Sequence, residues 1–215
     1  MLDLKEYTYN EISAYLGSNG VQAINRKLNN YGVKYEQVGR GRNSRYTITE
    51  ISDPFKVFSI CDMGVPAQTD WKKFRNFMYV LLCADDFGWR PNEMKEEYLR
   101  KKGMGISRQT IANYIKRLEN YGIVGQPSEA DCVYYKVYKE YGVQKHILIT
   151  KKEYGIAWSV YFQCKANGYD TGAAYNCMYN KIGGVPRKSY GVNICPFYNE
   201  LVDWIIKIIV EDVVP

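Results

Sequence analysis

Near the N-terminus, apolar residues first recur at the three- and four-residue steps of an α-helix and then alternate with polar ones. The helical spacing covers residues 8–16 and 21–31, which are separated by the turn sequence GSNG. The alternation covers residues 33–38 and 45–49, with a turn rich in Gly, Arg and Asn between them. Two such runs around a turn are typical of a β-hairpin. The pattern therefore predicts a helix–turn–helix–hairpin module in residues 1–51.

The same order of elements recurs after residue 70. Apolar residues again show helical spacing before they change to alternation. The predicted elements are a helix from Trp71, a short helix ending at Gly103, a helix over 108–121, and strands at 132–139 and 143–150. Ser107 is the expected N-cap of the third helix. Residues 71–152 are thus predicted to form a second module with the architecture of the first.

The remaining segments have weaker patterns. Residues 52–70 carry two prolines and no sustained period, which predicts an irregular connector that packs through Phe55 and Phe58. For residues 153–215 we expect a helix opened by the capping box of Thr150 and Glu153, a helix over 170–182, a loop at 183–186 and a last helix from Pro196. The expected fold is mainly α with small β-hairpins (α+β), with two modules followed by a helical C-terminal region.

The last helix is apolar on most of its faces. A helix of this kind is either buried or shared with a partner. Two readings therefore stay open, which are a homodimer formed through this C-terminal helix and burial of the helix against the core of its own chain.

Composition excludes several classes of protein. Among 215 residues, no apolar run approaches the roughly 20 that span a bilayer, so we expect no membrane segment. The N-terminal sequence carries acids and no apolar core, which argues against a secretory signal. Six cysteines are scattered without a CxxC pair, a usage typical of reduced thiols. The expected location is the cytoplasm.

No catalytic pattern is present in the sequence. It contains neither the GxxxxGK[ST] phosphate loop nor the GxGxxG dinucleotide fingerprint. One histidine, His146, cannot supply a two-histidine metal site, and the cysteine spacing does not fit a zinc cluster. We therefore expect a protein that is not an enzyme and that has no metal or cofactor.

Positive charge gathers in the two predicted modules. Residues 101–152 carry ten Lys and Arg against four Asp and Glu, and residues 1–51 carry seven against five. The chain as a whole has a formal charge of +6, so these two segments account for its excess. Clustered positive charge is what a surface facing phosphates requires.

The sequence SRQTIANYIKRLENYGI at 107–123 resembles the recognition helix of winged helix-turn-helix proteins such as the MarR- and GntR-like regulators. The matching features are the Ser cap, the Thr-Ile pair, the Ile and Leu core positions and the terminal Gly-Ile. This resemblance implies a helix that enters the major groove of double-stranded DNA. The residues expected to reach bases or phosphates are Ser107, Arg108, Gln109, Thr110 and Asn113, with Lys116 and Arg117 on the DNA backbone.

The N-terminal module resembles the same superfamily more weakly. Its candidate groove residues are Asn19, Gln22, Asn25 and Arg26, together with Ser18. Its hairpin turn carries Arg40, Arg42 and Arg45, which can follow a phosphate strand or enter a narrow minor groove. In the second hairpin, Lys136, Lys139 and Lys145 are expected on the DNA backbone.

Taken together, these features predict a sequence-specific double-stranded DNA-binding protein that acts as a transcriptional regulator. The chain also resembles helix-turn-helix proteins of mobile genetic elements, so a replication initiator of plasmid or phage type is the first alternative. A winged-helix scaffold for protein contacts is the second. The charge concentrated in residues 101–152 argues against the scaffold.

Overall fold

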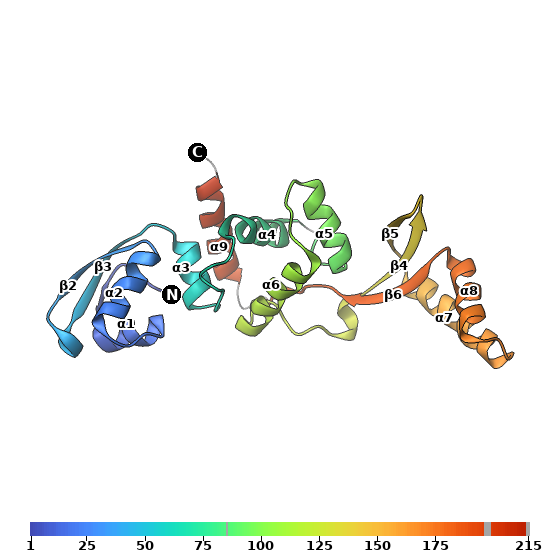
Figure 1. Cartoon of the computed structure of the whole chain (residues 1–215), viewed down its shortest axis with the longest axis horizontal. Helices are drawn as coiled ribbons and strands as arrows, with labels where there is room; N and C mark the ends of the chain where they lie inside the picture. The colour runs from blue at the N-terminus through green and yellow to red at the C-terminus, as the bar shows by residue number, and fades with distance from the viewer. Residues whose placement is uncertain (85, 196–198, 214–215) are drawn as a thin grey trace. The chain divides into compact units, whose positions relative to one another are not determined.

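The computed structural model describes residues 1–84, 86–195 and 199–213, which form two compact units (Figure 1). Unit 1 comprises Met1–Tyr79, Lys116–Ile123 and the described part of 196–215, and unit 2 comprises Val80–Ile115 and Val124–Cys195. Nine α-helices and two three-stranded antiparallel sheets occur in the described residues. The fold is therefore of mixed α+β class, as predicted.

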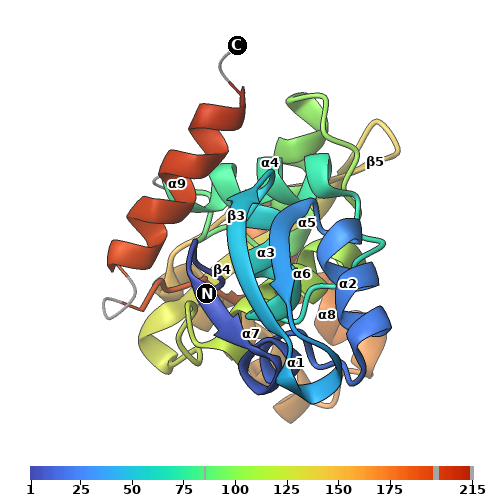
Figure 2. The same ribbon diagram turned by 90° about the vertical axis from the view of Figure 1, so that its left-hand side faces the viewer.

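Unit 1 opens with the elements that the sequence predicts, preceded by one short strand. They are β1 (Glu6–Thr8), α1 (Tyr9–Leu16), α2 (Val21–Asn30), β2 (Val33–Val38) and β3 (Arg45–Ile51), with a short 3-10 turn at Gly41–Asn43. The strands pair in the order β1-β3-β2, all antiparallel, and Figure 2 shows the β2–β3 hairpin beside α1 and α2. Ile12, Ile24 and Leu28 are fully buried against Tyr46 of β3, so the helices cover one face of the sheet.

The predicted irregular connector contains a helix, which corrects that expectation. Helix α3 spans Pro54–Cys61. The Asp53 carboxylate accepts a hydrogen bond from the Lys56 backbone N–H at 2.8 Å, and Pro54 occupies the first helical position. An acidic N-cap followed by proline is a helix-start signal, and it outweighs the missing period in so short a segment. Phe55 and Phe58 are buried, as expected from the sequence.

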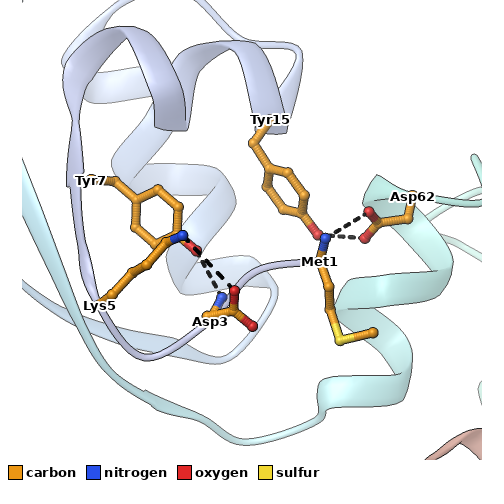
Figure 3. Close-up of polar contacts among 6 residues, drawn as sticks. All are labelled: Met1, Asp3, Lys5, Tyr7, Tyr15 and Asp62. Atoms are coloured by element: carbon orange, nitrogen blue, oxygen red, sulfur yellow. Dashed lines mark hydrogen bonds and ion pairs between the residues drawn. The ribbon is translucent and has the colours of Figure 1, made fainter. Parts of the chain in front are cut away.

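Asp62, directly after α3, ties the first helix to the third within unit 1 (Figure 3). The Tyr15 phenol on α1 donates to Asp62 Oδ2 at 2.5 Å. The Met1 amino group lies 3.1 Å from Asp62 Oδ1. Nearby, the Asp3 backbone N–H donates to the Tyr7 phenol oxygen at 2.8 Å. These contacts anchor the chain before β1 to the body of the module.

Helix α9 (Asn199–Val213) also belongs to unit 1. Its Ile205 and Ile209 side chains are buried, and the Trp204 ring packs edge-on against Phe58 of α3 at 5.4 Å. The apolar face of this helix is therefore occupied largely within its own chain, which is the second of the two readings from the sequence. The predicted start at Pro196 lies outside the described residues.

The predicted helices of the second module are α4 (Trp71–Cys83), α5 (Asn92–Lys101) and α6 (Arg108–Tyr121). Helices α4 and α6 contribute residues to both units. Unit 2 continues with β4 (Cys132–Glu140), β5 (Val143–Leu148), α7 (Lys151–Ala166), α8 (Thr171–Ile182) and β6 (Val185–Tyr190). Thr150 and Asp170 cap α7 and α8 by accepting hydrogen bonds from backbone N–H groups, so both helices begin where the sequence places them.

Strand β6 corrects two expectations, the loop at 183–186 and the purely helical C-terminal region. The strand begins at Val185 and pairs with β4, in a sheet of order β5-β4-β6. Pro186 removes a backbone donor, but an edge strand tolerates that loss on its outer side. The pairing joins Val185 to Val137, far apart in the sequence, so a local pattern does not reveal it.

Candidate nucleic-acid interface

Helix α6 has a buried apolar side and an exposed polar side. Ile111, Ile115 and Leu118 are buried. Gln109 and Asn113 are exposed one turn apart, and the Gln109 Nε2 donates to Asn113 Oδ1 at 3.2 Å. Two side-chain amides therefore face solvent near the start of the helix, with donors and acceptors left over for a ligand.

The side chains of Ser107 and Thr110 form hydrogen bonds at the N-terminus of α6. Ser107 Oγ accepts a hydrogen bond from the Thr110 backbone N–H at 3.2 Å and lies 2.9 Å from Thr110 Oγ1. This is the N-cap that the sequence predicts. Both hydroxyls thus take part in the hydrogen bonds that stabilise the first turn of the helix.

Arg108 is paired inside unit 2. Its Nη1 lies 3.1 Å from Glu93 Oε1 on α5, although 62% of the arginine side chain is exposed. The Arg108 guanidinium, which the sequence analysis expects to contact DNA, therefore has an intramolecular counter-ion in this structure. A phosphate or base would have to compete with Glu93 for the guanidinium.

A polar hollow of about 630 Å³ lies beside the start of α6. Its lining residues are Glu93, Glu96, Glu97 and Arg100 of α5, Ser107, Arg108 and Gln109, and Val143, Gln144, Lys145 and His146 of β5. Three carboxylates face three cationic side chains, so the hollow is close to neutral. A hydrogen bond with the Lys101 ammonium, which lies 2.9 Å away, lowers the pKa of Glu97.

The acidic residues of this hollow are functional candidates that sequence reasoning missed. Glu96 and Glu97 lie three and four residues after Glu93, which places them beside Glu93 on one side of α5. That spacing is visible in the sequence. What it does not reveal is that this side of α5 meets the start of α6, because the meeting depends on packing between the two helices.

The last two candidates on α6 differ from each other. Arg117 Nη1 donates to the Gly64 carbonyl oxygen at 2.5 Å within unit 1, so this guanidinium holds the chain after α3. Lys116 is exposed. Of this pair, Lys116 is the residue whose charge is more accessible to a phosphate.

The lysines of the second hairpin do not share one face. Tyr138 stands opposite Lys145, and Lys139 stands opposite Gln144. Because successive residues point to opposite sides of a strand, Lys139 and Lys145 lie on opposite faces of the sheet. Lys136 contacts the end of α8, since its ammonium donates to the Ile182 carbonyl oxygen at 2.6 Å. Only Lys145 lines the hollow beside α6.

In the N-terminal module, the structure brings together residues from the turn and the hairpin. Ser18, Asn19 and Arg42 line one hollow of about 580 Å³ next to α1. Gln22 and Arg26 are exposed on α2. Arg26 lines a different hollow with Lys27 and Lys56, so it is not gathered with Arg42 around one depression.

Three further candidates of this module have distinct surroundings. Asn25 Nδ2 donates to Gln37 Oε1 of β2 at 2.9 Å, which ties the helix to the sheet. Arg45 Nη1 lies 2.6 Å from Glu6 Oε1, a pair that joins β3 to β1. Arg40 is exposed in the β2–β3 turn. Arg40 and Arg42 are therefore the arginines of this turn best exposed for an outside ligand.

Comparison with protein-family models, with curated proteins and with solved structures finds no match for this chain. Within the described part of the chain, no helix has both the length and the apolar character needed to cross a bilayer. The same residues contain no group of three or more His, Cys, Asp or Glu side chains arranged to hold a metal ion.

Proposed function

We propose that this protein binds double-stranded DNA in a sequence-specific manner and acts as a transcriptional regulator. The observation that carries the proposal is the exposed pair of amides, Gln109 and Asn113, at the start of a helix whose other side is buried. Asn and Gln side chains form bidentate contacts with adenine in the major groove, which admits an α-helix. A winged helix-turn-helix arrangement would present them there.

The order of elements supports the same proposal. In the first module two helices precede an antiparallel hairpin, in a sheet of strand order β1-β3-β2, and in the second module three helices precede one. Lys145 on the second hairpin lies around the same hollow as Gln109, at the place where a wing would contact the DNA backbone. In the first module Arg40 and Arg42 are exposed on the hairpin turn, where arginine suits a narrow minor groove.

The first test is a titration of the full chain against random-sequence duplex by fluorescence anisotropy at several salt concentrations. We expect binding that weakens steeply with salt, with a log–log slope of about −0.9 per phosphate contact. Absence of binding at low salt would contradict the proposal and turn the search towards protein partners.

The second test addresses sequence specificity. A preferred site is selected from a pool of random duplexes, and the double variant Gln109→Ala/Asn113→Ala is compared on that site and on random DNA. We expect the variant to lose about 1–3 kcal/mol of discrimination for each lost bidentate contact while keeping its binding to random DNA. Asn167→Ala removes an exposed amide after α7 and is the matched control. Unchanged discrimination in the double variant would overturn the assignment of α6.

A further inference from the structure

Helices α7 and α8 form a two-helix hairpin (Figure 1) that carries few charges away from its end at Lys151–Glu153 and Lys181. Between Tyr154 and Asn180 the only charged residues are Lys165 and Asp170. Solvent-facing helix surfaces normally carry charged and polar side chains. A surface without them offers little to a phosphate backbone and favours an uncharged protein surface as its partner.

Large apolar side chains stand out from this surface. Phe162 is 63% exposed, Tyr175 40%, Ile156 38% and Tyr179 37%. The rings of Trp158 and Tyr161 lie between those of Phe162 and Tyr175. Each contacts both Phe162 and Tyr175, with 4.9–6.4 Å between ring centroids. With 150–250 Å² for a fully buried aromatic side chain, the three exposed rings, of Phe162 on α7 and of Tyr175 and Tyr179 on α8, supply on the order of 280 Å². That is about a third of the ~800 Å² that each partner buries in a standard interface.

The exposed side of α7 combines small and large residues. Gly155, Ile156, Ser159, Phe162 and Gln163 are all exposed and recur at three- and four-residue steps. Apart from the neighbouring residues and backbone of α7 itself, a Cβ at Gly155 would meet no atom of the described residues within 4 Å. Glycine inside an exposed helix weakens it by about 1 kcal/mol relative to alanine, and no close packing among the described residues requires glycine at this position.

From these features we propose that α7 is the self-association surface of this protein, and that its occupant is α7 of a second copy packed antiparallel about a two-fold axis. Phe162 and Gly155 lie two turns apart on one side of the helix, about 10 Å along its axis. An axis near Ser159 places the Phe162 ring of each copy in the space above Gly155 of the other. A projection and a gap on the same stripe make the surface complementary to itself, as a two-fold interface requires.

Ser159 fits the centre of such an interface. Its hydroxyl donates to the Gly155 carbonyl oxygen at 2.9 Å, so it needs no water when it is covered. Small residues at this spacing let two helix backbones approach closely. The apolar face of α9, in contrast, already packs on α3 within unit 1.

The experiment is sedimentation velocity of the full chain over a range of micromolar concentrations. We expect the wild type to reach twice the 25.0 kDa mass of one chain. Phe162→Glu is expected to remain a monomer, because it sets a charge into an apolar contact. Leu4→Glu changes a leucine that is 64% exposed in unit 1 and is expected to dimerise like the wild type.

Gly155→Leu separates self-association from folding. Leucine is the better helix former, and its side chain meets open space in a single chain, so the midpoint of thermal unfolding is expected to stay equal or rise. The same side chain fills the space meant for Phe162 and should abolish the dimer. A wild type that stays monomeric throughout the range, or a Gly155→Leu variant that dimerises normally, would overturn the proposal.

Discussion

The guanidinium of Arg108, the first residue of α6, is paired with the carboxylate of Glu93 on α5, with 3.1 Å between Nη1 and Oε1. The contact joins a residue that we propose to reach DNA to an acid in the same hollow. DNA that binds through Arg108 would therefore have to displace Glu93 or lie close to its negative charge. If α6 binds DNA as proposed, this pair would make Glu93 a residue that limits the affinity.

Glu93→Gln is expected to raise affinity for duplex DNA about threefold at low salt, in line with the 0.2–1 kcal/mol of an exposed ion pair. The variant releases Arg108 and removes a negative charge near the phosphates. Anisotropy titrations measure the change. Glu96→Gln, which removes the same charge from the same hollow, is the matched control and should have a smaller effect. Equal effects of the two variants would show that the pairing with Arg108 does not matter.

Lys95 on α5 is fully buried, and its ammonium donates to the Arg90 carbonyl oxygen. Burial lowers the pKa of Lys95 from 10.5 to about 8. Between pH 8 and pH 10.5, Lys95 is protonated in the unfolded chain and deprotonated in the folded chain. The contribution of Lys95 to the free energy of unfolding therefore rises with pH over this range. Below pH 8 the buried charge costs about 3 kcal/mol.

Lys95→Met is therefore expected to increase the free energy of unfolding at neutral pH and to remove the rise between pH 8 and 10.5. The gain is partly offset because the Arg90 carbonyl oxygen loses its donor. Urea unfolding at a series of pH values measures both effects. Lys102→Met, an exposed lysine just beyond the helix, should leave the pH profile unchanged. A Lys95→Met protein with the wild-type pH profile would refute the role of burial.

The hydrogen bond from Tyr15 to Asp62 predicts a stability effect in unit 1. Burial, together with the hydrogen bond to the neighbouring carboxylate, raises the pKa of Tyr15, so the phenol keeps its proton through alkaline pH. Tyr15→Phe is expected to lower the free energy of unfolding by about 1 kcal/mol, because Asp62 retains the Met1 amine as a partner. Urea unfolding measures the loss, and Tyr141→Phe at a fully exposed position serves as the control. Equal stability of both variants would show that this bond contributes nothing.

Gly39 controls the shape of the arginine-bearing turn. Its φ of +91° suits glycine, and a Cβ there would lie 2.6 Å from the Asn43 carbonyl oxygen. Gly39→Ala is expected to cost about 2–3 kcal/mol of stability and to weaken DNA binding, because it displaces Arg40 and Arg42. Gly41→Ala also has a positive φ but meets no atom within 4 Å, so about 1 kcal/mol is expected. Thermal unfolding compares the two, and identical losses would contradict the role of the Asn43 contact.

Local chemistry explains why most helices could be predicted. The caps at Ser107, Thr150 and Asp170 each accept a hydrogen bond from a backbone N–H three residues on, so a few neighbouring residues define the start of a helix. Helix α3 follows the same rule through Asp53, but its eight residues are too few to show a sustained hydrophobic period. Strands β1 and β6 differ, since each needs a distant partner.

Some features of the candidate site can likewise be predicted from the sequence, and others depend on the fold. The exposure of Gln109 and Asn113 follows from the positions of Ile111 and Ile115 on the same helix, because the helical period places them on different sides. The partners of Arg108, Arg117 and Arg45 could not be read from the sequence. Each is an atom brought near by packing or strand pairing, not by position along the chain.

The order of helices and hairpins, the buried stripe of α6 and the region of excess positive charge all follow from the amino-acid sequence. These depend on spacing, capping and composition, which act over a few residues. Three other features depend on the three-dimensional fold: the pairing of Glu93 with Arg108, the placement of Lys139 and Lys145 on opposite faces, and the packing of α9 on α3. Contacts of this kind join residues far apart in the chain, and they form because burial of apolar surface brings whole elements together.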